Sequence, residues 1–441
     1  MKIALIVFTA FLAISMNIYA QTPKEFADAW DTQHISKILP SNVRHKDVQK
    51  YLEELKKLGI KVEEVGRSYA SREIYQVEWG KGKTKVFLWS QMHGDEPTAT
   101  SALMDMFAFL QTNRAKIGWV KKLEESLTIR AVPMLNPDGA ELFQRRNLQS
   151  IDINRDAIDQ KTPEGNLLRR LRDEWQPEIG FNLHNQQYLT TAGRTNKQAS
   201  ISLLAVLGNG ENKTNDGFER NKRICGLIVN ALNQFIPGHI GRYDDDYNPR
   251  AYGDTFSSLG TPVILIETGG LHGKDEMYLV KMNFVAFLTA LQSLVDGSER
   301  AANPAVYDTL PFNSSGRIFN IIFRRANIVN YRKTDAPFVA DVAVNAERRR
   351  AQFLTPTFVR EVGDLSIYEG LDEYDVSGFY LVPRDGLLSV GSGGEFLFYK
   401  KDRQLDWNIE NFSDFVEKNP PDAVFSINRW LKGEGVVPKT K

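Results

Sequence analysis

Residues Lys85–Leu110 read KVFLWSQMHGDEPTATSALMDMFAFL, and this stretch decides the fold of the first part of the chain. The run KVFLWS is short and apolar, which is typical of a buried strand. Pro97 then stands in a first helical turn, and apolar residues recur at helical spacing as far as Leu110. A strand, a polar loop and a helix in this order predict one unit of an α/β domain. The polar loop contains His93-Gly94-Asp95-Glu96.

Strand-like and helix-like segments alternate on both sides of this unit, from Gln21 to about Gly297. Pro262–Ile266 (PVILI) is apolar at every position, as expected for a central strand covered on both faces. The other expected elements are strands at Leu127–Met134 and Glu178–His184, and helices at Pro163–Trp175, Asp216–Ile236 and Asp275–Val295. Residues 21–297 are therefore predicted to form an α/β catalytic domain, with a mixed, mostly parallel sheet flanked by helices.

The sequence changes in character after Asp296. Asp296–Pro311 contains two prolines and no clear period, and we interpret it as a linker. Short β-rich runs separated by turn residues follow it: Ile318–Phe323, Phe338–Val344, Gly378–Val382 and Glu395–Tyr399. Residues 298–441 are therefore expected to form a small β-rich accessory domain. Its charged residues stand singly and suggest no catalytic cluster.

Residues 1–20 have the layout of a secretory signal peptide. Lys2 supplies a positive charge, Ile3–Met16 is nearly continuous apolar sequence, and the small residue Ala20 precedes a polar stretch. The apolar run is short for a membrane-spanning helix, and no cysteine lies near the cut for lipid attachment. We expect cleavage after Ala20, a periplasmic or secreted protein, and no stable membrane insertion. An uncleaved membrane anchor is the alternative.

The composition excludes several classes of protein. Of the 441 residues, 42% are hydrophobic and 25% are charged, which excludes a disordered chain, a collagen and a polytopic membrane protein. Lys+Arg and Asp+Glu are equal at 55 each, so no basic surplus is available for phosphates and no nucleic-acid partner is expected. The single cysteine, Cys225, excludes an intrachain disulfide and a zinc site built on several thiolates. A metal site would have to use histidine and carboxylate ligands.

His93 and Glu96 lie three residues apart between a strand and a helix, where both can face one cation above the sheet. Alone the pair is weak evidence, because Glu96 would serve equally as an acid in the first turn of a helix. His184 ends another expected strand, and the carboxyl ends of strands in an α/β sheet open on a common crevice. Two histidines and one carboxylate form a ligand set of catalytic zinc. The alternative for His184 is a hydrogen-bonded core residue.

Glu267 follows the strand PVILI and precedes two glycines that would let a substrate approach the backbone. Near a zinc site its carboxylate could act as general base and then as general acid. Further polar residues stand in Arg145-Arg146-Asn147 and in Asp152–Asp156. An arginine can stabilise an oxyanion, and an Asn-Arg pair can clamp a carboxylate. The alternatives are a loop cap for Glu267 and solvated ion pairs for the other charges.

The order of the motifs is more specific than any one of them. HxxE, NPDG, RxN, DxNR, LH and IET, in this order over roughly Val48–Val295, resemble the zinc metallocarboxypeptidase family of the carboxypeptidase A type. The resemblance implies a carboxypeptidase-like fold and one zinc ion per chain. It also implies these roles: His93, Glu96 and His184 as zinc ligands, Glu267 as the general acid/base, Arg145 as the arginine that polarises the oxyanion, Asn154 and Arg155 as the clamp for the substrate carboxylate, and Asp152 as the acid that orients the first zinc histidine.

Two features depart from the family pattern. Asn182 stands where the family usually has Asp before Leu-His, which removes one negative charge. The family's mobile active-site tyrosine lies about twenty residues before the catalytic glutamate, and the spacing favours Tyr247 over the nearby Tyr243 and Tyr252 as this substrate-binding residue. Arg250, in the same stretch, either favours an acidic substrate residue or pairs with the acidic run that precedes it.

The expected function is zinc-dependent hydrolysis of a peptide bond. The favoured reading is a carboxypeptidase that releases a C-terminal residue from peptides or from peptidoglycan stem peptides, so the expected partner is a peptide or peptide-like substrate. One alternative is a zinc amidase or deacylase that acts on N-acyl amino acids. Another is an inactive protein that binds a glycan or a peptide. The sequence leaves the oligomeric state open.

Overall fold

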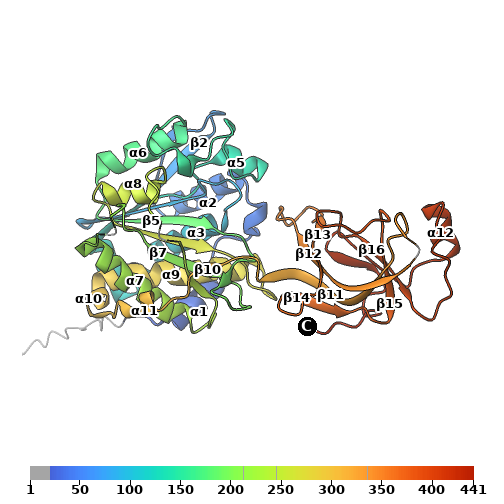
Figure 1. The fold of residues 1–441 in the computed structure, drawn as a ribbon. Helices are drawn as coiled ribbons and strands as arrows, with labels where there is room; N and C mark the ends of the chain where they lie inside the picture. Colours follow the sequence, from blue (N-terminus) through green and yellow to red (C-terminus); the bar gives the residue numbers. More distant parts are fainter. Residues whose placement is uncertain (1–19, 212, 245, 335) are drawn as a thin grey trace, which may run out of the picture.

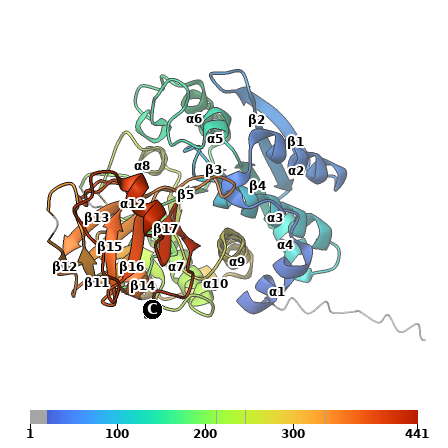
Figure 2. The same cartoon turned by 90° about the vertical axis from the view of Figure 1, so that its right-hand side faces the viewer.

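The computed structural model describes residues 20–441 except 212, 245 and 335. The expected signal peptide, apart from Ala20, therefore lies outside the described residues. Figures 1 and 2 show two parts, a helix-covered sheet coloured blue to yellow and a β-rich part coloured orange to red.

A mixed sheet of eight strands forms the centre of the first part, in the order β1-β2-β4-β3-β5-β9-β7-β8. The strands are β1 (Lys61–Arg67), β2 (Glu73–Gly80), β3 (Thr84–Ser90), β4 (Leu127–Val132), β5 (Ile179–Asn185), β7 (Ile201–Ala205), β8 (Ile240–Arg242) and β9 (Val263–Thr268). The central strands β4, β3, β5 and β9 run parallel, and the pairs β1/β2, β2/β4 and β7/β9 are antiparallel. The predicted mixed, mostly parallel sheet is confirmed.

Both faces of this sheet are covered, as the sequence of β3 illustrates. Val86 and Leu88 belong to the core on one face, and Phe87 and Trp89 belong to the core on the other. Side chains alternate across a strand, so a strand that is apolar at every position needs a cover on each side. The first face is covered by α1 (Pro23–Gln33), α2 (His45–Lys57), α3 (Thr98–Asn113), α4 (Gly118–Ser126), α7 (Asp216–Leu232) and α9 (Glu276–Asp296), and the second by α6 (Pro163–Trp175) and α8 (Tyr252–Ser258).

Side-chain caps define the ends of the expected helices. The oxygens of Thr162, Asn215 and Asp275 accept hydrogen bonds from the third backbone N–H of α6, α7 and α9. Among the described helices, α9 is the one long and apolar enough to cross a membrane, with a mean hydropathy of 1.4. Because 78% of that window is buried inside the fold, where α9 packs on α3 and α7, it is the central core helix of the sheet's first face.

The β-rich part is a second, largely antiparallel sheet, in the order β13-β12-β11-β15-β16-β17-β18, with β14 beside β11. Its strands are β11 (Ile318–Ile328), β12 (Phe338–Ala346), β13 (Thr357–Gly363), β14 (Glu369–Asp375), β15 (Phe379–Pro383), β16 (Phe396–Lys400), β17 (Ala423–Ser426) and β18 (Arg429–Lys432), and the short helix α12 (Phe412–Lys418) precedes β17. Phe323 is fully buried and contacts the rings of Phe396, Phe398, Phe425 and Trp430. The predicted β-rich C-terminal part is confirmed.

The segment between the two sheets differs from the expected linker. It contains two helical turns, α10 (Ser298–Ala301) and α11 (Ala305–Asp308), and both pack on α7. Tyr307 is fully buried in the core of the first sheet, which explains why this proline-containing segment is ordered there. A short pair, β6 (Thr191–Ala192) with β10 (Asn313–Ser314), then connects the parts. The domain boundary at residue 297 stays a prediction.

Candidate metal centre

Three strand ends bring the candidate residues to one edge of the first sheet. His93 lies in the loop after β3, His184 lies in β5, and Glu267 lies in β9. His184 and Glu267 are direct neighbours in the parallel pairing of β5 with β9. Glu96 comes from the turn before α3, where its backbone N–H donates to the carbonyl oxygen of His93 over 3.2 Å. The crevice at the carboxyl ends of the strands therefore contains all four side chains.

Close backbone packing holds the loop that carries His93. A Cβ atom on Gly94 would lie 2.0 Å from the carbonyl carbon of Gly139, so the two glycines are in direct backbone contact. The Asn136 side chain donates to the carbonyl oxygen of Met92 over 3.1 Å and accepts from the N–H of Gly139 over 2.8 Å. The NPDG motif thus begins α5 (Pro137–Leu142) and also supports the HGDE loop.

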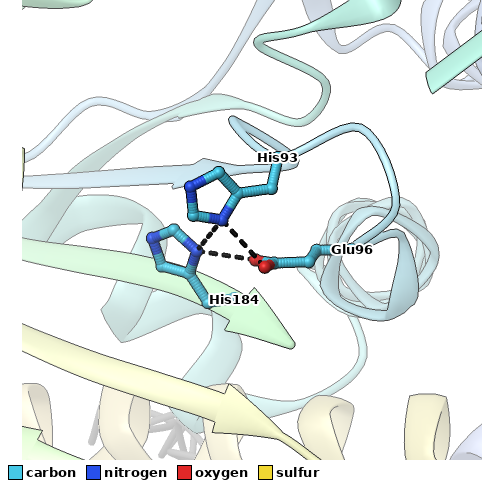
Figure 3. A group of neighbouring side chains, drawn as sticks. All are labelled: His93, Glu96 and His184. Carbon is cyan, nitrogen blue, oxygen red and sulfur yellow. Dashed lines mark hydrogen bonds and ion pairs between the residues drawn. The ribbon is translucent and has the colours of Figure 1, made fainter. Parts of the chain in front are cut away.

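His93, Glu96 and His184 form one buried group (Figure 3). Their exposed fractions are 2%, 5% and 2%. The Nδ1 atom of His93 lies 2.8 Å from one carboxylate oxygen of Glu96, and the Nδ1 atom of His184 lies 2.7 Å from the other. The two Nδ1 atoms are 3.2 Å apart. The three predicted zinc ligands are therefore confirmed as a single cluster.

The donor set and its spacing fit zinc. Nitrogen and oxygen ligands about 2.0–2.1 Å from a tetrahedral zinc ion lie roughly 3.4 Å apart, close to the separations found between these three side chains. Two imidazole nitrogens 3.2 Å apart cannot both carry a hydrogen, and their lone pairs repel unless a cation lies between them. Burial lowers the pKa of His93, but Glu96 and Asp152 outweigh burial and raise it to about 9. The cluster therefore stabilises a positive charge, and it forms one zinc site.

Asp152 determines which nitrogen of His93 faces this site. Its Oδ1 atom lies 3.0 Å from Nε2 of His93. A carboxylate accepts only, so Nε2 carries a hydrogen toward Asp152, and Nδ1 is the nitrogen whose lone pair would bind zinc beside Glu96. Despite burial, the contacts with His93 and Arg145 hold the pKa of Asp152 far below its usual range. Asp152 is therefore ionised, as a residue that orients a metal ligand must be.

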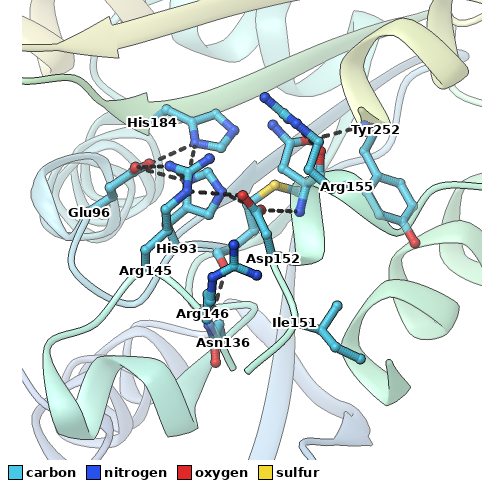
Figure 4. A network of polar contacts seen from close by, with 12 residues as sticks. His93, Glu96, Asn136, Arg145, Arg146, Ile151, Asp152, Arg155, His184 and Tyr252 are labelled. Atoms are coloured by element: carbon cyan, nitrogen blue, oxygen red, sulfur yellow. Dashed lines mark hydrogen bonds and ion pairs between the residues drawn. The ribbon is translucent and has the colours of Figure 1, made fainter. Parts of the chain in front are cut away.

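Arg145 contacts the same group, as Figure 4 shows. Its Nε atom donates to Oδ2 of Asp152 over 3.0 Å, and its Nη1 atom lies 3.3 Å from the Glu96 carboxylate. The Arg145 side chain is 44% exposed, so the guanidinium lies at the mouth of the site. A cation held beside the ligands and open to solvent is placed to meet a developing negative charge on a substrate oxygen.

A cavity of about 1200 Å³ opens over the cluster. It is lined by all the residues for which the sequence suggested a direct role: His93, Glu96, Arg145, Asn154, Arg155, His184, Tyr247 and Glu267. Glu267 is 6% exposed, and its Oε2 atom has no hydrogen-bond partner in the described part of the chain. Burial and the nearby charge of Glu96 raise its pKa well above the usual value for a carboxyl. A carboxylate in these surroundings readily accepts a proton.

Asn154 and Arg155 lie on the short helix η2 (Ile153–Arg155) at the wall of this cavity. The Asn154 side-chain oxygen accepts from the backbone N–H of Tyr252 over 3.0 Å, which orients the carboxamide and leaves its amide nitrogen to donate. Arg155 donates to the carbonyl oxygen of Asn154 over 2.6 Å. Arg250 donates to the carbonyl oxygen of Arg155 over 3.2 Å, so Arg250 supports this segment.

The three tyrosines near Glu267 are placed differently. Tyr252 is fully buried beside Phe256, away from the cavity. Tyr243 and Tyr247 both line the cavity. The charge of Glu267, together with burial, raises the pKa of Tyr243, so the Tyr243 phenol is near the general-base candidate. Spacing along the sequence favours Tyr247, but spacing does not show that Tyr243 lies near Glu267.

Sequence reasoning missed a group of charges from the β-rich part. Glu347, Arg348 and Arg360 also line the cavity, although they lie on and beside the loop between β12 and β13. We expected the charges of this part to stand singly. The run Ala346-Glu347-Arg348-Arg349-Arg350 between two predicted strands was the available signal, but nothing in the sequence indicates that this loop reaches the other sheet.

Comparisons with known proteins concern the first part of the chain. Residues 47–206 match the model of the zinc carboxypeptidase family. Carboxypeptidase 2 of Trichophyton tonsurans is 31% identical over 112 residues, which are 25% of this chain and 20% of that protein. Carboxypeptidase SOL1 of Arabidopsis thaliana is 33% identical over 96 residues, 20% of each chain. The chain thus spans about a fifth of the length of these curated relatives.

Among solved structures, the match with a metallo-carboxypeptidase from Burkholderia cenocepacia spans 57% of this chain and 69% of that protein's chain. Its TM-score is 0.48 and the sequence identity is 17%. The match with a metallo-carboxypeptidase from Pseudomonas aeruginosa spans 57% of this chain and 68% of that protein's chain, with a TM-score of 0.46 and 17% identity. The matched segment 47–206 contains His93, Glu96 and His184, the complete ligand triad. Residues 47–206, with the complete ligand triad, are therefore similar to the zinc carboxypeptidase family.

Proposed function

We propose that this protein is a zinc-dependent carboxypeptidase that removes the C-terminal residue from peptides. The observation that carries the proposal is that one cavity is lined by the ligand triad, by the buried carboxylate of Glu267 and by the donor pair Asn154 and Arg155. Hydrolysis of a peptide bond at a chain end needs these three kinds of group within reach of one substrate. Zinc held by the triad supplies a Lewis acid that polarises the scissile carbonyl and makes water more acidic.

Glu267 is proposed to move the proton. Its unpartnered Oε2 atom and raised pKa suit a base that takes a proton from the attacking water and then delivers it to the leaving amine nitrogen. Arg145, held in place by Asp152, would donate to the carbonyl oxygen as negative charge develops there. Asp152 would keep the His93 ring oriented throughout.

The carboxylate clamp would make the enzyme an exopeptidase. Asn154 and Arg155 present an amide N–H and a guanidinium to the same cavity, and two such donors bind a terminal carboxylate with directed, charge-assisted hydrogen bonds. Tyr247 or Tyr243 would cover the bound residue. A peptide with a blocked C-terminus would lose these contacts, so it should be hydrolysed slowly.

Peptidoglycan stem peptides are included in the proposed substrate class. The layout of residues 1–20 and the single cysteine support a periplasmic or secreted protein, which would meet these peptides. The alternative reading, a deacylase of N-acyl amino acids, would use the same metal and clamp with an acyl chain in place of the peptide.

A substrate panel on the purified protein tests the proposal. The panel comprises an N-blocked dipeptide with a free C-terminus, the same dipeptide as its C-terminal amide, an N-acetyl amino acid and a murein tripeptide, and metal content is measured in parallel. We expect one zinc ion per chain and hydrolysis of the free-acid dipeptide at a rate at least 100-fold above its amide. Preferred hydrolysis of the N-acetyl amino acid would support the deacylase instead. Stoichiometric zinc with no hydrolysis of any compound would overturn the proposal.

A further inference from the structure

The loop between β12 and β13, residues 347–356, packs against the first part of the chain. Arg350 in this loop is 3% exposed and points into the first part of the chain. Its guanidinium donates to the backbone carbonyl oxygens of Ser41, Val43, Ala140 and Glu141. The next two backbone N–H groups, of Ala351 and Gln352, donate to the side chains of Ser41 and Asn42, each over 3.1 Å. The loop is therefore bound to the catalytic part at residues 350–352.

A second contact holds the start of this loop. Tyr188 follows β5 and lines the cavity. Its hydroxyl lies within hydrogen-bond distance of two groups of the β-rich part, the carbonyl oxygen of Ala346 at 2.9 Å and the side chain of Asn320. Tyr188 is only four residues from the zinc ligand His184. The β-rich part is thus tied to the active-site edge on both sides of residues 347–349.

Between these two ties, the loop and the neighbouring strand present positive charge to the cavity. Arg348 and Arg360 line the cavity, and neither has an ion-pair partner among the described residues. Glu347 also lines it, but its carboxylate is paired with Arg349 over 2.8 Å. Arg348 lies over the ring of Phe143, with 5.8 Å between the guanidinium carbon and the ring centroid. The uncompensated charge of this wall of the cavity is positive.

These arginines stand apart from the carboxylate clamp. Asn154 of the clamp is hydrogen-bonded to the start of α8, and Asp254 of α8 is close enough to Arg155 for its pKa to respond to that charge. Arg348 instead contacts Phe143 at the end of α5, and both Arg348 and Arg360 act electrostatically on the phenol of Tyr188. A peptide whose terminal carboxylate lies at Asn154 and Arg155 would pass the metal ligands and meet the arginines with its upstream residues.

Other acidic residues also line the cavity. Asp95 is one of them, and it interacts electrostatically with Arg348, so it offsets part of the positive charge of this wall. Asp244 and Asp246 also line the cavity and lie in the segment after β8. This segment contacts α8, because the backbone N–H of Asn248 donates to the Asp254 carboxylate over 3.2 Å.

Resting on the proposed carboxypeptidase activity, we propose that Arg348 and Arg360 of the β-rich part are substrate-specificity residues that bind a carboxylate upstream of the scissile bond. The preferred substrates would then be acidic peptides, with a negative charge one to three residues before the bond that is cut. The β-rich part would complete the active site by supplying the wall that selects for this charge.

Matched peptides test this inference on the full chain. Two N-blocked peptides share one C-terminal dipeptide and differ only in Glu or Gln at the two preceding positions. We expect kcat/KM to be about tenfold higher for the Glu peptide, mainly through KM, and the ratio to fall as salt is raised. In the double variant Arg348→Gln with Arg360→Gln, the ratio should fall to about one. In Arg348→Glu with Arg360→Glu, a peptide with Lys at these positions should become preferred over the Glu peptide.

Arg384→Gln is the matched control, because Arg384 belongs to the same β-rich part and pairs with Glu395, and neither residue lines the cavity; its ratio should stay at the wild-type value. Thermal unfolding of each variant checks that it is folded. Equal kcat/KM for the Glu and Gln peptides in the wild type would overturn the inference, as would an unchanged preference in the folded double variant. Either result leaves the carboxypeptidase proposal intact, because that proposal fails only if the wild type hydrolyses neither peptide.

Discussion

Asp152 accepts a hydrogen bond from Nε2 of His93 over 3.0 Å, and this contact leaves Nδ1 of the same ring facing Glu96. The two residues are 59 positions apart, yet together they determine the tautomer of a zinc ligand. Arg145 binds the second oxygen of Asp152, so the ligand and the candidate oxyanion donor share one carboxylate. In the proposed mechanism, metal binding and transition-state stabilisation are therefore coupled through Asp152.

Replacing Asp152 should weaken zinc binding without removing a ligand. In Asp152→Asn, the carboxamide can present its nitrogen to Nε2 of His93, so the orientation and basicity of the ring are lost. We expect zinc affinity to fall by about 10- to 100-fold, measured by competition with a chelator. Asp159→Asn, an exposed aspartate in the following turn, is the control and should keep wild-type affinity. Equal affinities in the two variants would contradict the role of Asp152.

Removing the carboxylate of Glu267 should abolish turnover while zinc stays bound. Glu267→Gln keeps the size of the side chain, but an amide cannot accept and return a proton. We expect kcat to fall by about 100- to 10,000-fold, with KM changed much less. Zinc content should remain one per chain, because Glu267 is not one of the three ligands. Retention of more than a tenth of the wild-type kcat would exclude Glu267 as the general base.

A single methyl group at Gly94 should disrupt the metal loop. The Cβ of Gly94→Ala would lie 2.0 Å from the backbone of Gly139, which has no flexible atom to move aside. We expect the free energy of unfolding to fall by about 3 kcal/mol, together with weaker zinc binding. Gly378→Ala is the control, since its Cβ would meet no atom within 4 Å and its φ is not positive. Chemical denaturation of both metal-free variants measures the difference.

Asp254 should make the folded state less stable as the pH rises from about 4 to 6. Burial raises its pKa to about 6, whereas an unfolded aspartate titrates near 4. Between these values the folded state keeps a proton that the unfolded state has lost, so ionising Asp254 costs stability. Asp254→Asn should therefore be more stable than wild type above pH 6, by at most about 3 kcal/mol, with no gain below pH 4.

Unfolding by urea at pH 4, 5, 6 and 7 measures this difference. A constant difference between Asp254→Asn and wild type across the range would show that the Asp254 carboxyl titrates normally.

Arg350 should hold the β-rich part in place. Arg350→Met fills a similar volume but leaves buried carbonyl oxygens at Ser41, Val43, Ala140 and Glu141 without their donor. We expect the free energy of unfolding to fall by about 2–4 kcal/mol and the loop at 347–356 to become more sensitive to protease. Arg349→Met should have little effect, because Arg349 pairs only with Glu347 at the surface. Equal protease sensitivity of the two variants would contradict the anchoring role.

Much of the first part could be predicted from local pattern. The apolar run in β3, the capped helix α6 and the fully apolar β9 follow from rules that act within one element, such as side-chain alternation and helix capping. The helical turns α10 and α11 within Asp296–Pro311 could not be predicted in this way, because their packing on α7 and the burial of Tyr307 are long-range contacts that no local pattern records. Which of Tyr243 and Tyr247 lies near Glu267 could not be predicted either, because it depends on the tertiary structure and not on spacing along the sequence.

By itself, the sequence determined the class of the fold and the identity of the zinc ligands. His93, His184 and Glu267 lie at or just after the carboxyl ends of strands, which open on one edge of a parallel sheet. Their residue types alone left other readings open, and it was the order of the motifs, through its resemblance to a known family, that assigned the zinc ligands. Only the tertiary structure decided that Arg348 and Arg360, more than 150 residues beyond His184, line the same cavity. That contact depends on hydrogen bonds from Arg350 to backbone carbonyl oxygens of residues 41–43 and of α5. Every residue has a backbone carbonyl, so no sequence pattern marks these acceptors.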